Sequence, residues 1–415
     1  MSIPVRELFR VFLRIGVLSF GGPAAQIAVM HRELVEDRPW LTERQFLNAL
    51  SFCMLLPGPE AMQLATYCGW RLNGLAGGLV AGLLFVLPGA AVMLGLAWAY
   101  AAFGTVPLVE ALFLGIKATV VVIVLGALLK VSQKALTGTG HWVIAALSFV
   151  AIFLFAAPFP LIIACAAACG VLTGGASAQP APALGRAGTL RTVAVWGAAW
   201  WAPVAAAWAA GQTLLTEVGL FFSKLAIVTF GGAYAVLAYM TQEVVQDQGW
   251  LTTAQMMDGL GLAETTPGPL ILVTEFVGYL AGAAAGGPGL AVAAAAMTVW
   301  VTFVPCFLWI FAGAPYIEWI STRPRLTGAL SAITAAVVGV ILNLSLWFAT
   351  HVFFAQVATL RAGPLHLLTP DPTTLDLRAL ALALAAGGLL LGLKWGLMRV
   401  LFLAALAGAG LSFLG

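Results

Sequence analysis

The chain has 415 residues, of which 62% are hydrophobic and only 8% are charged, and its mean hydropathy is +1.02. Soluble domains carry about 25% charged residues, so this chain has too few polar side chains to cover a water-exposed surface. Its net charge of +3 is too small to indicate nucleic-acid binding. We therefore expect an all-α polytopic protein whose solvent is the lipid bilayer.

Several apolar runs are long enough to span the bilayer, which takes about 20 helical residues. In chain order they cover 74–103, 108–129, 141–172, 193–214, 290–312, 326–348 and 377–414. The run 141–172 contains APFP at 157–160, which predicts a short helical hairpin rather than one helix. Arg10 and Arg14 interrupt the first apolar stretch, which lacks the layout of a signal peptide. The five cysteines lie in apolar segments and are interpreted as packing residues, with no metal or redox cofactor expected.

The sequence repeats itself after 210 residues. Residues 20–59 align with 230–269 without a gap, and 17 of the 40 positions are identical, including FGG, WLT and PGP. A stretch rich in Gly, Ala and Pro at 173–188 marks the junction between the copies. We therefore expect a first repeat at 1–175, a linker with a transmembrane helix at 176–215, and a second repeat at 216–415.

The loop after FGG differs between the copies in its positive charge. Three arginines of the first copy are replaced in the second, the aligned pairs being Arg32/Gln242, Arg38/Gln248 and Arg44/Ala254. Lys and Arg are retained on the cytoplasmic side, so the first loop is predicted to be cytoplasmic and the second periplasmic. This makes the copies inverted repeats in the inner membrane, with a cytoplasmic N-terminus and a periplasmic C-terminus.

The FGG and PGP motifs interrupt apolar segments at matched positions of both copies. Proline lacks an N–H and glycine adopts unusual dihedrals, so each motif is predicted to end one half-helix and start another, as a re-entrant or broken helix. Such breaks survive at membrane depth only when buried in protein or lining a cavity. The new helix starts offer N–H groups and partial positive charge to an anion. The alternative is that the breaks are packing kinks.

Ionisable residues near the breaks are candidates for substrate binding or ion coupling, because such side chains are costly in a membrane. Arg14 and Lys224 each precede FGG by six residues, and either bind substrate or extend to the interface. Lys117 lies within an apolar run and needs either the substrate or a carboxylate partner. Glu60 and Glu264 flank the two PGP motifs and are candidates for proton coupling or charge balance.

Neutral polar residues at the breaks are further candidates. Gln63, one turn after the first PGP, can donate a hydrogen bond to an anion without adding charge. Hydroxyl groups precede both kinds of break and either bind an oxyanion or cap helix ends. These hydroxyl residues are Ser19, Thr229, Thr265 and Thr266.

The ordered motifs SFGGP, WLTE and LPGP, at fixed separations, resemble the signature region of the chromate ion transporter family in its long, two-domain form. The resemblance is strong over 12–90 and clear over 222–312. It implies secondary transport of chromate, typically efflux that confers resistance, with sulfate as the look-alike substrate. It also implies functional positions at Arg14, Gly21, Gly22, Pro23, Pro57, Gly58, Pro59, Gln63, Gly231, Gly232, Pro267, Gly268 and Pro269. Glu60 and Ala61 depart from the family pattern, in which small hydroxyl residues often follow PGP.

The sequence leaves alternatives open within this frame. The leading hypothesis is an alternating-access transporter of chromate or sulfate, with the bilayer and a possible homodimer as its partners. A passive anion channel with the same site chemistry is the second. A membrane enzyme is disfavoured, because the sequence has no clustered Cys/His site, no flavin or haem motif and no soluble catalytic domain.

Overall fold

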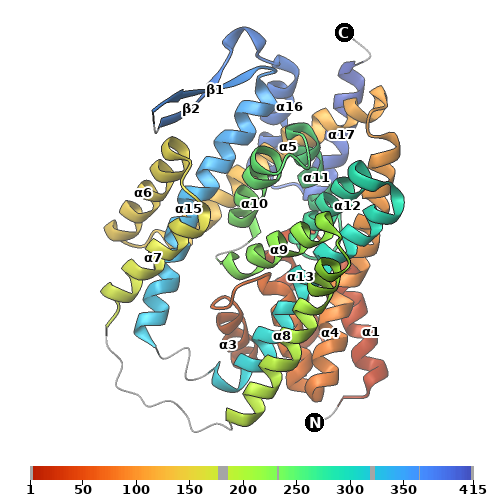
Figure 1. Cartoon of the computed structure of the whole chain (residues 1–415), viewed down its shortest axis with the longest axis vertical. Helices are drawn as coiled ribbons and strands as arrows, with labels where there is room; N and C mark the ends of the chain where they lie inside the picture. The colour runs from red at the N-terminus through yellow and green to blue at the C-terminus, as the bar shows by residue number, and fades with distance from the viewer. Residues whose placement is uncertain (1–2, 176–185, 231–232, 318–322, 364, 413–415) are drawn as a thin grey trace. The chain divides into compact units, whose positions relative to one another are not determined.

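The structure, a computed structural model, describes residues 3–175, 186–230, 233–317, 323–363 and 365–412. Within these ranges the chain is helical except for loops and one two-stranded hairpin. Four described helices are long and apolar enough to cross a membrane (Figure 1). They are α4 (Glu60–Phe103), α5 (Pro107–Ala135), α13 (Pro288–Gly313) and α15 (Pro324–Phe353). The predicted all-α fold class is confirmed.

These long helices also present large apolar side chains at the surface. Leu87 and Trp98 of α4 are 50% and 59% exposed, and Leu129 of α5 is 53% exposed. Large apolar side chains exposed along a long helix are unfavourable in water and favourable against lipid. The chain is therefore a polytopic membrane protein.

The two sequence repeats fold into the same succession of helices. In the first copy these are α1 (Val5–Leu18), α2 (Gly22–His31), α3 (Glu43–Cys53) and then α4. In the second they are α9 (Thr213–Val228), α10 (Ala233–Gln242), α11 (Thr253–Thr265) and α12 (Val273–Gly286). The predicted helix breaks at SFG and PGP of the first copy and at PGP of the second are confirmed. The second FGG break also follows the end of α9, but its Gly231 and Gly232 lie outside the described residues.

Matched hydrogen bonds extend the repeat to atomic detail. Thr42 and Gln45 form a reciprocal capping box at the start of α3, and Thr252 and Gln255 make the same pair of bonds at the start of α11. The amide N–H groups of both loop tryptophans, Trp40 and Trp250, donate to carbonyls six residues earlier. Local structure therefore repeats with the sequence, while the inverted orientation of the copies stays a prediction.

The remaining apolar runs fold partly as expected. The predicted hairpin at 141–172 is confirmed as α6 (Thr139–Phe155) and α7 (Phe159–Thr173). The run 193–214 lies mostly in α8 (Arg186–Ala209). The run 377–414 is not continuous, because Lys394, with a φ of 54°, lies between α16 (Leu377–Gly387) and α17 (Leu397–Ser412).

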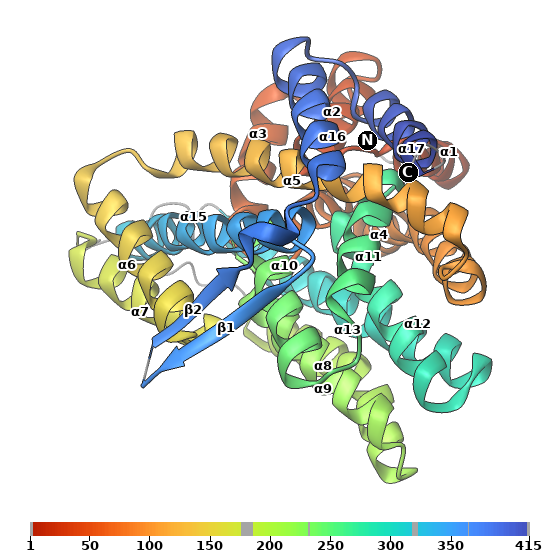
Figure 2. The ribbon, with the colours of Figure 1, turned by 90° about the horizontal axis from the view of Figure 1, so that it is seen from above.

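One hairpin was not predicted from sequence. Strands β1 (Val357–Ala362) and β2 (Leu365–Pro370) pair antiparallel in the loop between α15 and α16. Strand β2 contacts α6, and Figure 2 shows the hairpin beside that helix.

The chain divides into two compact units, and each unit takes segments from both repeats. Unit 1 comprises Met1–Trp98, Gly174–Ala233 and Leu262–Thr327. Unit 2 comprises Ala99–Thr173, Tyr234–Gly261 and Gly328–Gly415. The repeat boundaries predicted from sequence describe the duplication and remain a prediction, whereas these units describe packing.

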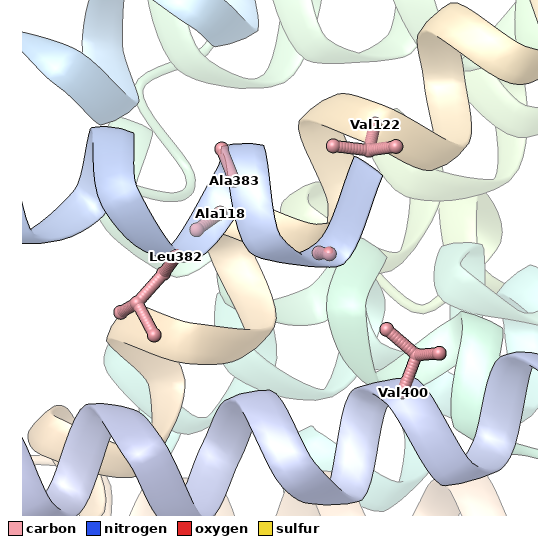
Figure 3. Packing of buried hydrophobic residues seen from close by; sticks show 6 residues of the cluster. Ala118, Val122, Leu382, Ala383 and Val400 are labelled. Atoms are coloured by element: carbon pink, nitrogen blue, oxygen red, sulfur yellow. The ribbon is translucent and has the colours of Figure 1, made fainter. Parts of the chain in front are cut away.

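Unit 2 has an apolar core where α5 packs against the C-terminal helices. Figure 3 shows Ala118 and Val122 of α5 together with Leu382 and Ala383 of α16 and Val400 of α17. All five are buried. Small side chains let these helices approach closely, which is how helices associate where no hydrophobic driving force from water exists.

The end of α2 carries a pH-sensitive contact. His31 lies 2.6 Å from a Glu43 oxygen and 3.0 Å from a Glu36 oxygen, and its pKa is raised by these carboxylates, chiefly by the hydrogen bond to Glu43. A folded-state pKa above the unfolded value stabilises the fold fully below about pH 6.5, and the contribution is lost as the pH rises through the folded pKa. We expect the melting temperature of the wild type to exceed that of His31→Gln by more at about pH 5.5 than at about pH 9. An equal difference at both pH values would contradict this.

Candidate functional site

The first kind of break is at FGG, and the hydroxyl residue that precedes it makes the same hydrogen bond in the two copies. In the first copy α2 begins at Gly22 after a left-handed cap at Gly21, whose φ is 84°. The Ser19 hydroxyl donates to the carbonyl of Ile15 over 2.6 Å, and the Thr229 hydroxyl donates to that of Leu225 over the same distance. Both hydroxyls are buried and satisfied by their own helix. An oxyanion could use these groups only if the hydroxyls rotated away from the helix carbonyls.

The second kind of break is PGP, with its glycine in a backbone conformation that other residues rarely adopt. The φ of Gly58 is 115° and that of Gly268 is 85°. After the first PGP, α4 begins at Glu60, and after the second, a short 3₁₀ turn over Leu270–Leu272 leads into α12. Thr265 and Thr266 donate their hydroxyl hydrogens to carbonyls three residues earlier. Here too the hydroxyls serve the helix end.

The breaks of the two copies are joined by a reciprocal pair of hydrogen bonds within unit 1. The backbone N–H of Gly58 donates to the carbonyl of Thr229 over 2.8 Å, and that of Gly268 donates to the carbonyl of Ser19 over 2.8 Å. The 210-residue shift maps Gly58 onto Gly268 and Ser19 onto Thr229. Each PGP glycine is therefore bonded to the residue just before FGG in the other copy. The sequence predicted N–H groups open to an anion at the breaks, whereas these two are already engaged in hydrogen bonds.

A small cavity lies where the breaks of the two copies meet. It is lined by Pro23 and Gln26 of α2, by 58–61 at the start of α4, and by 269–271. Its volume is about 20 Å³, enough for one water molecule. The first turn of α4 forms one wall of the cavity, and the amide N–H groups of a helix's first turn have no partner within their own helix. In this conformation the cavity has no room for a tetrahedral oxyanion.

Two glutamines hold the polypeptide around this cavity. Gln63, fully buried, donates from Nε2 to the Pro57 carbonyl over 2.6 Å, while its Oε1 has no partner among the described residues. Gln26, also buried, donates from Nε2 to the Gly268 carbonyl over 2.6 Å. Gln26 was missed from sequence, although a glutamine in the otherwise apolar stretch after FGGP was the available signal. The predicted Gln63 lies at the break, where part of its donor capacity is used.

Close packing of α4 against the second break requires another glycine. A Cβ added at Gly89 would lie 2.2 Å from the carbonyl oxygen of Pro267. Real Cβ atoms do not approach backbone that closely, so only glycine admits this contact. The first copy's long helix thus supports the second copy's PGP.

Three carboxylates of unit 1 lie near these elements in the chain. Glu60 begins α4, where the helix dipole favours a carboxylate. Glu264, three residues before the second PGP, is 4% exposed. Glu275 of α12 is also 4% exposed, and its Oε2 has no hydrogen-bond partner among the described residues. The burial of Glu275 makes it a further candidate beside Glu60 and Glu264.

Two of the predicted cationic residues, Arg14 and Lys224, are exposed. The Arg14 Nε lies 3.2 Å from Oε1 of Glu33, and Arg38 Nη1 lies 2.5 Å from Oε2 of the same buried carboxylate. The Arg14 side chain is 56% exposed, which fits an interfacial ion pair more than a substrate ligand. Lys224, at the matched position of α9, is exposed as well.

Lys117 has a carboxylate partner that the sequence did not identify. Its Nζ lies 3.0 Å from Oδ1 of Asp258, and the Tyr100 hydroxyl donates to Oδ2 of Asp258 over 2.7 Å. All three residues belong to unit 2, whereas the described break residues belong to unit 1. The sequence left either the substrate or a carboxylate as the partner of Lys117, and in the structure Lys117 pairs with a carboxylate.

Comparisons with known proteins identify the family of the chain. A family model described as chromate transporter matches residues 6–171 and 216–410. A chromate transport protein of Pseudomonas aeruginosa is 35% identical over 88% of this chain and 84% of its own length. One from Cupriavidus metallidurans is 34% identical over 81% of this chain and 80% of its own, and a probable one from Synechococcus elongatus is 32% identical over 81% and 82%. No solved structure matches the chain. By both the matched regions and the extent of these identities, the chain belongs to the chromate transporter family.

Proposed function

We propose that the protein is a secondary transporter that exports chromate, or a chemically similar divalent tetrahedral oxyanion such as sulfate, across the inner membrane. Family membership and relatives named as chromate transport proteins support the substrate class. The observation that carries the mechanism is the reciprocal bonding of Gly58 to Thr229 and of Gly268 to Ser19. It brings breaks from both copies to one small cavity, as expected of a transporter whose site lies between repeats.

The way in which these breaks are held together supports a mechanism of alternating access. The cavity accommodates about one water molecule, so an oxyanion enters only when the breaks separate. Two backbone hydrogen bonds contribute about 0.5–1.5 kcal/mol each, which is small enough for thermal opening. If the repeats are inverted, opening toward one side or the other breaks equivalent contacts, which gives two states of similar energy. A constriction of this size also favours a transporter over an open channel.

Charge balance at the site is assigned to Glu60, with Glu264 and Glu275 as further candidates. The Glu60 carboxylate stands at the start of α4, the position where the helix dipole would otherwise attract the substrate anion. A protonated Glu60 leaves that position to the oxyanion, and an ionised Glu60 repels it. Proton binding would thereby be coupled to anion binding, and the substrate would be released when the proton leaves.

Flux measurements in proteoliposomes test this proposal. We expect the wild type to accumulate radiolabelled chromate or sulfate under an imposed pH gradient. Glu60→Gln mimics the protonated form, so it should still exchange anion across the membrane but lose the response to the pH gradient. Glu110→Gln, which changes an exposed carboxylate at the start of α5 in unit 2, is the matched control.

The outcomes separate the alternatives. If the wild type never accumulates the anion beyond its electrochemical equilibrium, under any pH or voltage gradient, the protein is a passive anion channel. A Glu60→Gln variant that responds to the pH gradient like the wild type would exclude Glu60 from coupling and move the test to Glu264→Gln and Glu275→Gln.

A further inference from the structure

A second and much larger cavity lies within unit 2. Its volume is about 430 Å³, and it is lined by segments of α6, α10 and α15 and by the β1–β2 hairpin. This volume is within the range of small-molecule sites, which is roughly 300–1,000 Å³. None of the break residues considered above lines it, so it belongs to no site described so far.

One face of the hairpin supplies the positive charge. Arg361 of β1 and His366 of β2 are directly opposite each other in the antiparallel register, so their side chains share a face of the hairpin. Thr359 and Leu368, the next pair on that face, also line the cavity. Among the described residues, no carboxylate forms an ion pair with Arg361, and no Asp or Glu lines the cavity.

Neutral hydrogen-bonding groups complete the lining. The side-chain amides of Gln242, Gln246 and Asn343 and the hydroxyl of Thr253 line the same cavity. Thr241 also lines it, is only 3% exposed, and its Oγ1 has no hydrogen-bond partner among the described residues. A buried hydroxyl without a hydrogen-bond partner is destabilising, so a bound partner in the cavity would remove that cost.

We propose that this cavity is a second anion site, which binds a tetrahedral oxyanion in partly hydrated form. Arg361 provides the principal charge, because a planar guanidinium presents paired donors to oxyanions. Thr241 and the amides supply neutral donors, and the absence of carboxylates from the lining removes the groups that would repel the ligand. The identity of the oxyanion as the transported species rests on the proposed function, whereas binding itself does not.

The loop after FGG in the second copy, which contributes Gln242 and Gln246 to the lining, is predicted to be periplasmic, and this makes the cavity an external site. An anion held there after export would be retained near the membrane surface, or one arriving from outside would be concentrated there. The phosphate of a lipid headgroup shares the oxyanion chemistry and is the competing source of ligand.

Protection of an introduced thiol tests the site directly. In a chain whose exposed Cys165 and Cys169 are replaced by alanine, Thr359→Cys places a thiol on the lining, and N-ethylmaleimide labels it in detergent. We expect sodium sulfate at ten times its dissociation constant to slow the labelling about tenfold relative to sodium chloride of equal ionic strength. Thr369→Cys, exposed on the opposite face of the hairpin, should be labelled at the same rate in both salts.

Second substitutions assign the effect to the proposed ligand. Arg361→Gln should abolish the protection of Thr359→Cys, whereas Arg378→Gln, an exposed arginine at the start of α16, should leave it unchanged. If Thr359→Cys fails to give a monodisperse protein, Thr253→Cys reports from the α11 side of the cavity.

Three results would overturn the proposal: no protection by sulfate, equal protection at positions 359 and 369, or protection that survives Arg361→Gln. Protection by phosphatidylglycerol but not by sulfate would assign the cavity to a lipid headgroup and would overturn it as well. Because labelling in detergent needs no transport, this test can fail while proteoliposome flux succeeds, and the reverse.

Discussion

Gly58→Ala is expected to abolish anion flux in proteoliposomes while leaving a protein that still inserts and folds. The φ of Gly58 is 115°, a value that costs a residue with a Cβ about 1–3 kcal/mol. The added Cβ would lie 2.9 Å from Nε2 of Gln63 and 3.1 Å from Sγ of Cys306. Relief of these contacts shifts the Gly58 N–H, so the hydrogen bond from the first copy's PGP to the Thr229 carbonyl of the second copy is lost.

Gly268→Ala should have the same effect through the matched bond to Ser19. Its φ is 85°, and the added Cβ would lie 3.2 Å from Cδ1 of Leu272 and 3.4 Å from the carbonyl oxygen of Phe85. Because its closest contact would be 3.2 Å, longer than the 2.9 Å contact at Gly58, we expect Gly268→Ala to retain more flux than Gly58→Ala.

Gly74→Ala is the matched control for backbone strain. Gly74 sits at the kink of α4 with φ 61° and ψ −152°, which also requires glycine, but its added Cβ would meet no atom within 4 Å. All three variants should therefore lose stability in thermal unfolding, while only the two PGP variants lose flux. If Gly74→Ala lost flux to the same extent as Gly58→Ala, strain anywhere in unit 1 would suffice and the breaks would have no special role.

The helix breaks could be predicted because their causes are local. Proline removes a backbone donor and glycine permits positive φ, so PGP and FGG end helices wherever they occur. Duplication then allowed the hydroxyls at Ser19 and Thr229 to be paired by alignment, and both make the same bond to the preceding turn. Sequence reasoning succeeded here because each bond lies within a few residues of its motif.

The contacts between the copies could not be predicted, because they join residues far apart in the chain. Nothing in PGP indicates that its glycine N–H donates to Thr229 or Ser19 rather than to a ligand. The hairpin of 357–370 was missed for a related reason. Its strands are short, β1 is mostly exposed and β2 is mostly half-buried, and their alternation is too weak to distinguish them from a loop.

The sequence predicted that Lys117 needs a partner, but the duplication did not help to identify it. The cost of burying a lysine predicted a substrate or a carboxylate, and Asp258 provides the carboxylate. The pair joins a lysine of the first copy to an aspartate of the second, and the first-copy residue aligned with Asp258 is Asn48. The duplication therefore has no equivalent pair, and the alignment carried no signal for this one. The two copies have thus diverged in their buried charges more than in their helix breaks.

Removing one member of the Lys117–Asp258 pair is expected to destabilise the protein strongly, and removing both is expected to restore it. Lys117 and Asp258 are 20% and 7% exposed, so Asp258→Asn leaves a lysine with little access to water, at a cost of about 3–5 kcal/mol. Lys117→Met leaves an uncompensated carboxylate, which Tyr100 alone still hydrogen-bonds. The double variant leaves no buried charge, and an asparagine that can still accept from Tyr100.

We would measure thermal unfolding and anion flux for the two single variants and the double variant. These measurements separate a structural charge pair from a substrate ligand. Lys130→Met, which changes an exposed lysine of the same helix, is the control. A charge pair predicts that the double variant recovers both stability and flux, because its neutral residues have nothing left to neutralise. A substrate ligand predicts that stability returns while flux stays lost, because methionine offers the oxyanion no charge. We expect recovery of both, since Asp258 already satisfies Lys117 within unit 2 and leaves the breaks of unit 1 to bind the anion.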